Sequence, residues 1–173
     1  MVNASGKSEG MVMGTAKRYH KTFPVSWEQL HRDAKALAWR LLETGPYEGI
    51  ICIARGGLVP GAIVARELEV RLIETVCVSS YDRQDQGAAR VLKSVRGSGK
   101  GWLIIDDLVD TGRTARLVRD MLPEARFACV YVKPEGRAVA DAYVTEVSQD
   151  TWILFPWDSE VRFVEPIIHR ADE

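Results

Sequence analysis

Hydrophobic positions recur at helical spacing early in the chain. Between Trp27 and Leu41 they return every three or four residues, and Ser26-Trp-Glu-Gln29 has the form of a capping box. Gly45-Pro46 then supplies two residues that end helices. The pattern therefore predicts an amphipathic helix that begins after Ser26 and ends before Gly45.

Short apolar runs then alternate with stretches of helical spacing. The expected strands are Ile50–Ala54, Leu72–Val78, Trp102–Ile105 and Phe127–Val132, and the expected helices are Ala62–Leu68 and Thr114–Met121. Continuously apolar strands that alternate with helices are typical of an α/β fold whose parallel sheet is covered on both faces. The polar, glycine-containing segment 82–100 interrupts this order and is typical of a lid that closes over a ligand.

Composition limits the fold to one domain. The chain has 173 residues, 46% of them hydrophobic, which suits a single core. Residues 1–22 show no periodicity and predict a disordered tail ahead of one domain at 23–173. Cys52, Cys77 and Cys129 lie in apolar stretches without metal-ligand spacing, and we interpret them as buried, reduced thiols of a cytoplasmic protein.

Ligands of parallel sheets bind beyond the carboxyl ends of the strands, so the residues after each apolar run are candidates for a site. These candidates are Arg55-Gly56-Gly57, Ser79-Ser80-Tyr81, the segment from Asp106 to Thr114, and Lys133-Pro134. They combine cations, carboxylates, hydroxyls and glycines. This mixture suits a ligand with phosphate, metal and hydroxyl groups, and it does not suit an apolar ligand.

The segment from Gly101 to Leu117 carries the most informative pattern. Asp110-Thr-Gly-Arg-Thr114 leads from a strand into a helix N-terminus, where free N–H groups and the helix dipole favour a phosphate. Asp106 and Asp107 suit Mg²⁺ or sugar hydroxyls. A competing interpretation is that Asp110 caps the helix while Asp106 and Asp107 are solvated surface groups.

The order of four apolar residues, Asp-Asp, two apolar residues and Asp-Thr-Gly-x-Thr resembles the phosphoribosyl diphosphate (PRPP) signature of the type I phosphoribosyltransferases. IARGGLVPGAIVAREL, VCVSSYD, KPEGR and QDTWILFPWD are likewise similar to the bacterial xanthine-guanine group of that family. The resemblance implies a type I phosphoribosyltransferase fold, with a twisted, mainly parallel sheet and a small C-terminal hood at about 148–173. It also implies Mg²⁺ dependence and transfer of the phosphoribosyl group to N9 of guanine, xanthine or, more weakly, hypoxanthine, giving GMP, XMP or IMP and diphosphate. A cytoplasmic homotetramer with weak peripheral association at the inner membrane is implied in the same way.

The resemblance also implies a role for each matching residue. PRPP is expected to contact Arg55, Gly56, Asp106, Asp107, Leu108, Val109, Asp110, Thr111, Gly112, Arg113 and Thr114. Among these, Asp107 matches the metal-associated acid and Asp110 the catalytic carboxylate close to the purine. Lys133 matches the donor to the 6-oxo group, Trp152 the aromatic that stacks on the base, and Ile153 the residue whose backbone reads the edge bearing the 2-substituent.

Two positions depart from the enteric bacterial pattern, and one alternative function stays open. Arg113 replaces a second glycine, so we expect its side chain to point outward. Gly87 falls where that pattern has an arginine on the diphosphate, a contact that Arg83 or Arg90 could supply. The same fold also serves PRPP-sensing regulators that bind RNA or DNA; a net charge of -1 argues against that function and against a nucleic-acid partner.

Overall fold

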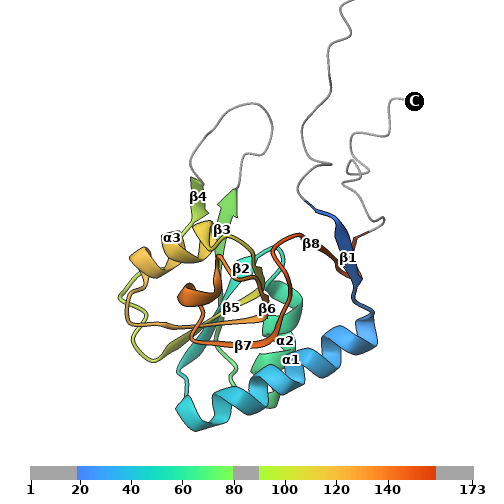
Figure 1. Cartoon of the computed structure of the whole chain (residues 1–173). Helices are drawn as coiled ribbons and strands as arrows, with labels where there is room; N and C mark the ends of the chain where they lie inside the picture. Colours follow the sequence, from blue (N-terminus) through green and yellow to red (C-terminus); the bar gives the residue numbers. More distant parts are fainter. Residues whose placement is uncertain (1–18, 80–89, 159–173) are drawn as a thin grey trace, which may run out of the picture.

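The computed structural model describes residues 19–79 and 90–158. Six strands form the main sheet in the order β4-β3-β2-β5-β6-β7. Their bounds are β2 Gly49–Ala54, β3 Ile73–Ser79, β4 Arg90–Lys93, β5 Trp102–Val109, β6 Arg126–Val132 and β7 Ala142–Glu146. Neighbours run parallel except for β3 and β4, so the sheet is mainly parallel as expected (Figure 1).

Three α-helices cover the two faces of this sheet. They are α1 Trp27–Leu41, α2 Leu58–Glu67 and α3 Arg113–Met121, and two short 3₁₀ helices are η1 Leu42–Thr44 and η2 Arg137–Val139. Helices α1 and α2 lie on one face and α3 on the other (Figure 1). One buried cluster lies under α1 and α2 and includes Leu37 and Val64, whereas a second lies under α3 and includes Val118 and Phe127. Residues of β2 and β5 enter both clusters, so the sheet is buried on both faces. Within residues 19–79 and 90–158, no helix has the length and apolarity that crossing a membrane requires.

Helix α1 begins as the sequence predicts. The Gln29 backbone N–H donates to Ser26 Oγ at 3.1 Å, which is the expected N-cap. The apolar stripe of α1 then packs on the sheet. A polar contact adds to this packing, because the Tyr131 hydroxyl on β6 donates to Asp33 Oδ2 on α1 at 2.7 Å in a buried position.

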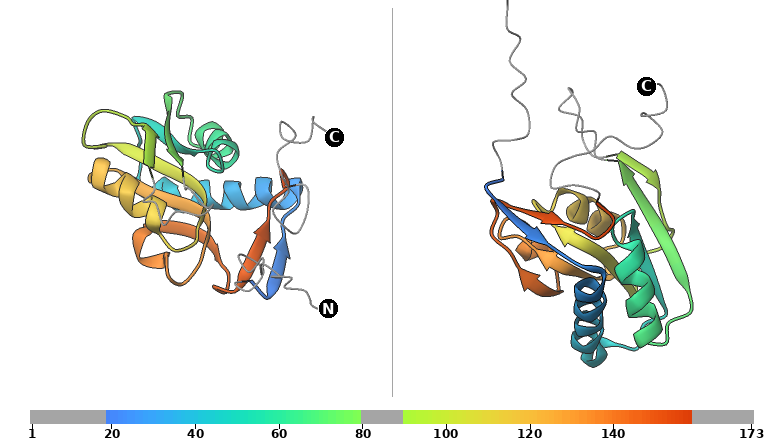
Figure 2. Two further views of the ribbon diagram at one scale, coloured as in Figure 1. Left: turned by 90° about the horizontal axis from the view of Figure 1, so that it is seen from above. Right: turned by 90° about the vertical axis from the view of Figure 1, so that its right-hand side faces the viewer.

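A small second sheet stands beside the main one. β1 Lys21–Pro24 and β8 Thr151–Leu154 pair in parallel, with Phe23 opposite Ile153 (Figure 2). Lys21 and Thr22 therefore belong to the folded domain, and so do Tyr19 and His20, which bond to Asp110 and to the Asp150 carbonyl. The predicted tail boundary after residue 22 is wrong for residues 19–22. Within the expected hood at about 148–173, β8 pairs with a strand from near the start of the described chain. Residues 1–18 and 159–173 lie outside the described residues.

Several element boundaries differ from the sequence-based expectation. β5 continues through Asp106 and Asp107 to Val109, because this segment stays paired with β6. Part of the expected lid, Arg90–Lys93, is the antiparallel edge strand β4, while residues 80–89 lie outside the described part. Cys52 and Cys129 are buried as predicted, whereas Cys77 is only half-buried.

Candidate active site

Two adjacent carboxyl groups lie at the end of β5. Asp106 is 8% exposed, and its Oδ1 accepts from the Asp107 backbone N–H at 3.0 Å. Asp107 Oδ1 accepts from the Leu108 backbone N–H at 2.7 Å. Burial, with the neighbouring carboxylate, raises the pKa of Asp106 well above its ordinary value, and burial raises the pKa of Asp107 to about 6. Asp106 is buried and Asp107 is half-buried, so the pair is not solvated surface charge, and a bound cation would stabilise its charged form.

The loop after β2 meets this acid pair. A Cβ added to Gly56 would lie 2.2 Å from Asp107 Oδ2, so only glycine allows the backbone and the carboxylate to come this close. Arg55, the preceding residue, is exposed. The structure thus brings together Arg55-Gly56 and Asp106-Asp107, which the sequence assigned to one ligand from two different strand ends.

The donor set fits a hard cation that is shared with a substrate. Residues 19–79 and 90–158 contain no group of three His, Cys, Asp or Glu side chains arranged to hold a metal. Mg²⁺ takes few protein ligands and completes its shell with water and phosphate oxygens. The carboxylate of Asp107, with Asp106 beside it, suits such partial coordination.

The turn before α3 is the segment where the sequence predicts a phosphate cradle. Gly112 has φ 77° and is the N-cap of α3. The backbone N–H groups that follow it form the N-terminus of the helix. Arg116 Nη2 closes the turn by donating to the Thr111 carbonyl at 2.7 Å. Arg113 is exposed, as expected for its outward side chain. Asp110 makes no capping bond to α3, so the interpretation of Asp110 as a helix cap is wrong.

In the middle of the segment from Asp106 to Thr114, side chains pack into the protein and leave mainly the backbone for a ligand. Val109 is buried in the core, and its carbonyl accepts from the Lys133 N–H at 2.9 Å. Leu108 is half-buried and packs against the core, and Thr111 and Thr114 are half-buried at the cradle.

A second group of side chains surrounds Asp110. Lys133 is 1% exposed, and its Nζ lies 3.3 Å from Asp110 Oδ1. Gln149 Nε2 donates to the same oxygen at 2.7 Å, while the Tyr19 hydroxyl donates to Asp110 Oδ2 at 2.9 Å. Trp152 lies edge to face with Tyr19, with ring centroids 5.2 Å apart. Asp110, Lys133 and Trp152, which the sequence predicts as purine contacts from three separate segments, therefore lie around one point.

On strand β8, Ile153 points its side chain into the core and leaves its backbone groups at the strand edge. The Ile153 side chain is 4% exposed in the core. The carbonyls of Asp150 and Leu154 accept from the β1 side, and backbone groups alternate in direction along a strand. The N–H and C=O of Ile153 therefore lie on the edge of β8 that faces away from β1, which is compatible with the expected role of this backbone.

Sequence reasoning missed two residues of this group and named others that cannot be assessed. Gln149 is the first residue of QDTWILFPWD, and its place in that motif could have marked it. Tyr19 lies in the segment interpreted as a tail, where no pattern indicated it. Arg90 lies exposed on β4, and Ser80, Tyr81, Arg83 and Gly87 lie outside the described residues.

Comparisons with known proteins agree with this arrangement. The family described as phosphoribosyl transferase domain matches residues 26–163. A protein named xanthine-guanine phosphoribosyltransferase from Nitratidesulfovibrio vulgaris (strain DP4) is 68% identical over 162 residues, which are 93% of this chain and 99% of that protein. One of the same name from Desulfotalea psychrophila is 60% identical over 154 residues, 88% of this chain and 96% of that protein.

A solved structure agrees as well. The crystal structure of a purine phosphoribosyltransferase from Pyrococcus horikoshii matches with a TM-score of 0.72 at 30% identity. The match covers 84% of this chain and 99% of the Pyrococcus chain. The family match spans most of the chain, and the relatives are matched over nearly their whole length. The chain therefore belongs to the phosphoribosyl transferase domain family, among its bacterial type I purine members.

Proposed function

We propose that the chain transfers the 5-phosphoribosyl group of PRPP to N9 of a 6-oxopurine and releases diphosphate, as a xanthine-guanine phosphoribosyltransferase of purine salvage. The relatives matched over most of the chain carry that name. One observation carries the proposal: Asp110 connects the turn before α3 with the side chains assigned to the purine. Its carboxylate pairs with Lys133 and accepts from Tyr19, whose ring lies against Trp152. A phosphorylated sugar and a flat base then fit on either side of Asp110.

PRPP would lie between two groups of residues. Its 5′-phosphate would be held by the N–H groups of the turn Asp110–Thr114 at the start of α3, which attract an anion. Its diphosphate would lie by Arg55 and Gly56, where the arginine supplies positive charge and the glycine admits close backbone approach. Asp106 would accept hydrogen bonds from the ribose hydroxyls.

The purine would be recognised by residues from three segments. Lys133 Nζ would donate to the 6-oxo group, and a 6-amino group would instead place donor against donor. Trp152 would stack on the ring, and the Ile153 backbone would read the edge bearing the 2-substituent. Asp110 would face the imidazole side of the base, close to N7 and the reacting N9.

The transfer needs no covalent enzyme intermediate. The N9 lone pair forms the new bond to C1′ while the C1′–O bond breaks and its electron pair leaves with diphosphate. The sugar carbon passes through a state of oxocarbenium character, and the imidazole proton of the purine is lost to Asp110. Orientation of both substrates and stabilisation of charge supply the rate enhancement.

Asp107 would hold Mg²⁺ together with oxygens of PRPP, and the ion would neutralise charge on the diphosphate leaving group. Asp107→Asn should lower activity most strongly at low Mg²⁺, because a neutral amide is a poorer ligand for a hard cation. Initial rates measured across a Mg²⁺ titration, with the exposed Asp120→Asn as matched control, check this expectation. An unchanged Mg²⁺ dependence would remove Asp107 from the metal role.

The proposal extends to a cytoplasmic homotetramer with weak peripheral association at the inner membrane, as the sequence resemblance implies. Light scattering of the purified chain tests the assembly, and sedimentation with anionic vesicles tests the association. A monomer, or a protein that stays in the supernatant, would contradict the respective part.

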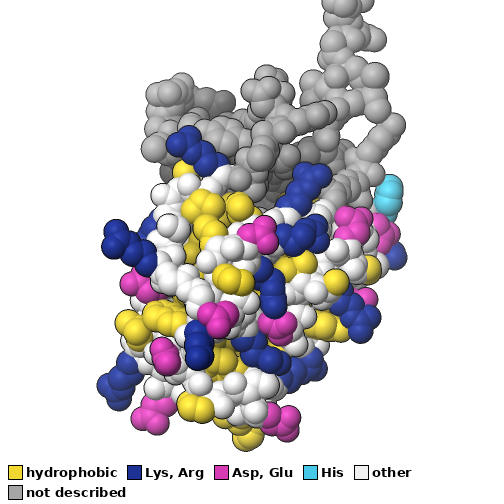
Figure 3. All heavy atoms as spheres, turned by 90° about the vertical axis from the view of Figure 1, so that its left-hand side faces the viewer, with side chains coloured by type: hydrophobic (Ala, Val, Ile, Leu, Met, Phe, Trp, Pro, Cys, Tyr) yellow, Lys and Arg dark blue, Asp and Glu magenta, His cyan; other side chains and the backbone are white. Residues whose placement is uncertain are grey.

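The alternative of a nucleic-acid-binding regulator has no support. Lys and Arg side chains are interspersed with Asp and Glu side chains over the described residues of the face in Figure 3. A net charge of -1 adds no general attraction to a phosphate backbone.

Release of diphosphate from PRPP, measured separately with guanine, xanthine, hypoxanthine and adenine, tests the proposed function. We expect turnover with guanine and xanthine, weaker turnover with hypoxanthine, and none with adenine. Absence of turnover with every 6-oxopurine would overturn the proposal and favour the regulator.

A further inference from the structure

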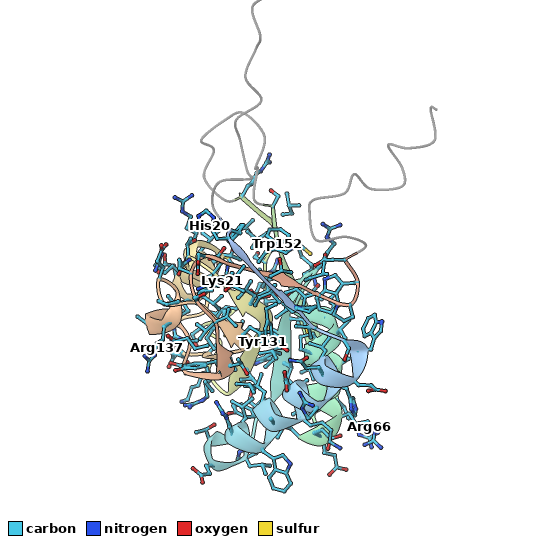
Figure 4. All side chains as sticks on the ribbon, turned by 45° about the vertical axis from the view of Figure 1, so that its right-hand side comes forward. His20, Lys21, Arg66, Tyr131, Arg137 and Trp152 are labelled. Carbon is cyan, nitrogen blue, oxygen red and sulfur yellow. The ribbon has the colours of Figure 1, made fainter. Side chains whose placement is uncertain are left out.

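Tyr19 contacts each of the three side chains to which the purine is assigned. Its hydroxyl donates to Asp110 Oδ2 at 2.9 Å, Lys133 Nζ lies 4.4 Å from its ring centroid, and Trp152 lies edge to face with its ring. These contacts join residues from the start of the chain to the ends of β5 and β6 and to β8. Figure 4 shows the neighbouring His20 and Lys21 at the same end of the molecule as Trp152.

We propose that the phenol ring of Tyr19 occupies the base position of the ligand-free chain and that an incoming purine must displace it. The inference rests on the proposed function, because it takes the purine contacts from there. A phenol resembles half of a purine in the features that matter here. It is flat, it offers one donor to a carboxylate, and its π face accepts a cation.

The hydrogen bonds of Asp110 favour displacement over joint binding. Oδ1 already accepts from Gln149 at 2.7 Å and faces Lys133 at 3.3 Å. Oδ2 is the oxygen that Tyr19 uses. A purine that donates to this carboxylate therefore competes with the phenol for the same atom.

The backbone lets Tyr19 leave without unfolding the hood. The N–H groups of His20 and Lys21 both donate to the Asp150 carbonyl, at 2.8 and 3.2 Å. The β1–β8 pairing thus begins directly after Tyr19. Rotation of this one residue frees the site while the pairing of β1 with β8 stays in place.

Displacement reduces the apparent affinity for the base by the fraction of chains whose site is open. With about 10–30% of chains open, removal of the phenol should tighten binding about three- to tenfold. Tyr19→Ala should show the full effect, and Tyr19→Phe, which loses only the hydroxyl bond to Asp110, a smaller effect in the same direction. PRPP is assigned to the backbone N–H groups of the turn Asp110–Thr114 and not to the Asp110 carboxylate, Lys133 or Trp152, so its affinity should stay unchanged.

Calorimetric titration of the full chain with GMP, and separately with PRPP and Mg²⁺, tests the inference. His20→Ala is the matched control, because it changes an exposed neighbour on the same segment. We expect a lower Kd for GMP in Tyr19→Ala, with wild-type values for His20→Ala and for PRPP in every variant. An unchanged or raised Kd for GMP would overturn the inference and make Tyr19 a wall of the pocket, with the proposed function intact. Failure of every variant to bind GMP, together with absence of turnover, would overturn the proposed function and the inference with it.

Discussion

At the scale of single residues, Asp106 and Asp107 place two acidic groups where ionisation lowers the stability of the fold. Two carboxyl groups lie side by side in a desolvated place, and burial raises the pKa of both. A carboxyl group whose pKa is higher in the folded than in the unfolded chain destabilises the fold increasingly as the pH rises from the unfolded to the folded pKa, and fully above the folded pKa. The ligand-free fold therefore carries a local cost that a bound cation would remove.

The first prediction follows from this cost. Asp107→Asn should stabilise the ligand-free chain at pH 8 by up to about 3 kcal/mol, because the amide is neutral and keeps the oxygen that accepts from Leu108. The difference should shrink as the pH falls through about 6, where wild-type Asp107 takes up a proton and loses its own cost. Urea unfolding at pH 8 and pH 5 with a chelator present measures it.

Asp120→Asn, an exposed change on α3, controls for the loss of one charge. Equal stabilities of wild type and Asp107→Asn at pH 8 would contradict the raised pKa of Asp107.

Lys133 is the residue on which base selectivity depends. It is 1% exposed and paired with Asp110, so its charge is shielded from water. Lys133→Met should lower kcat/KM for guanine about ten- to a hundredfold, since a charge-assisted hydrogen bond in such a place contributes roughly 1.5–3 kcal/mol. The gap between guanine and adenine should narrow as well. Steady-state kinetics with both bases measure these effects.

Lys35→Met is the control, since it breaks a half-exposed ion pair between Lys35 on α1 and Glu67 at the end of α2. Normal guanine kinetics and unaltered discrimination against adenine in Lys133→Met would reject the assignment of Lys133 to the 6-oxo group.

At the scale of elements, the site depends on how closely the loop between β2 and α2 approaches β5. The Asp107 carboxylate fills the space where a Cβ of residue 56 would stand. Gly57 is similarly tight, because its Cβ would lie 2.3 Å from the Ile105 carbonyl. Two consecutive glycines thus allow a loop and a strand end to share one binding site.

Gly56→Ala should therefore act on PRPP and spare the base. The methyl group would push Asp107 and the loop apart, and we expect the KM for PRPP to rise at least tenfold while the Kd for GMP changes less. Gly45→Ala is the matched control, since its Cβ would meet Tyr47 only at ordinary contact distance. A Gly56→Ala chain with a wild-type KM for PRPP would show that the loop lies apart from the diphosphate.

The elements also show where sequence reasoning succeeded. The helix from Ser26 and the buried strands β2, β5 and β6 were predicted, because capping and apolar runs act within a few residues. The short strands β4 and β8 were missed, since their apolar patterns are too short to distinguish them from loops. β5 was cut short at Ile105 because charged residues ordinarily mark the end of a buried strand.

At the scale of the whole molecule, one buried polar contact joins α1 to the sheet. Tyr131 is fully buried on β6 and packs edge to face with Phe23 and Phe155 of the hood region. Its hydroxyl donates to Asp33 Oδ2 at 2.7 Å. Burial, together with the hydrogen bond to Asp33, raises the pKa of Tyr131, so the hydroxyl stays a donor.

Tyr131→Phe should lower the free energy of unfolding by about 1–3 kcal/mol, because Asp33 loses its buried donor. The KM for guanine should stay as in wild type, since the hydroxyl that is removed is bonded to Asp33 on α1 and not to Asp110. Urea unfolding and steady-state kinetics measure the two effects. The double variant Tyr131→Phe with Asp33→Ala should lose less unfolding free energy than the two single variants lose together. Full additivity of the two losses would argue against a direct contribution of the hydrogen bond.

The sequence by itself determined the α/β class, the capped first helix, the turn that leads from Asp110 into α3 and the residues that meet at the strand ends. Periodicity, capping and the Asp-Thr-Gly-x-Thr order are local, and parallel strands bring their carboxyl ends to one edge. Only the tertiary structure decided that β1 pairs with β8, that Lys133 pairs with Asp110, and that Tyr19 reaches a carboxylate 91 positions away. Contacts between such distant positions leave no periodic trace, because they arise from the packing of the whole chain.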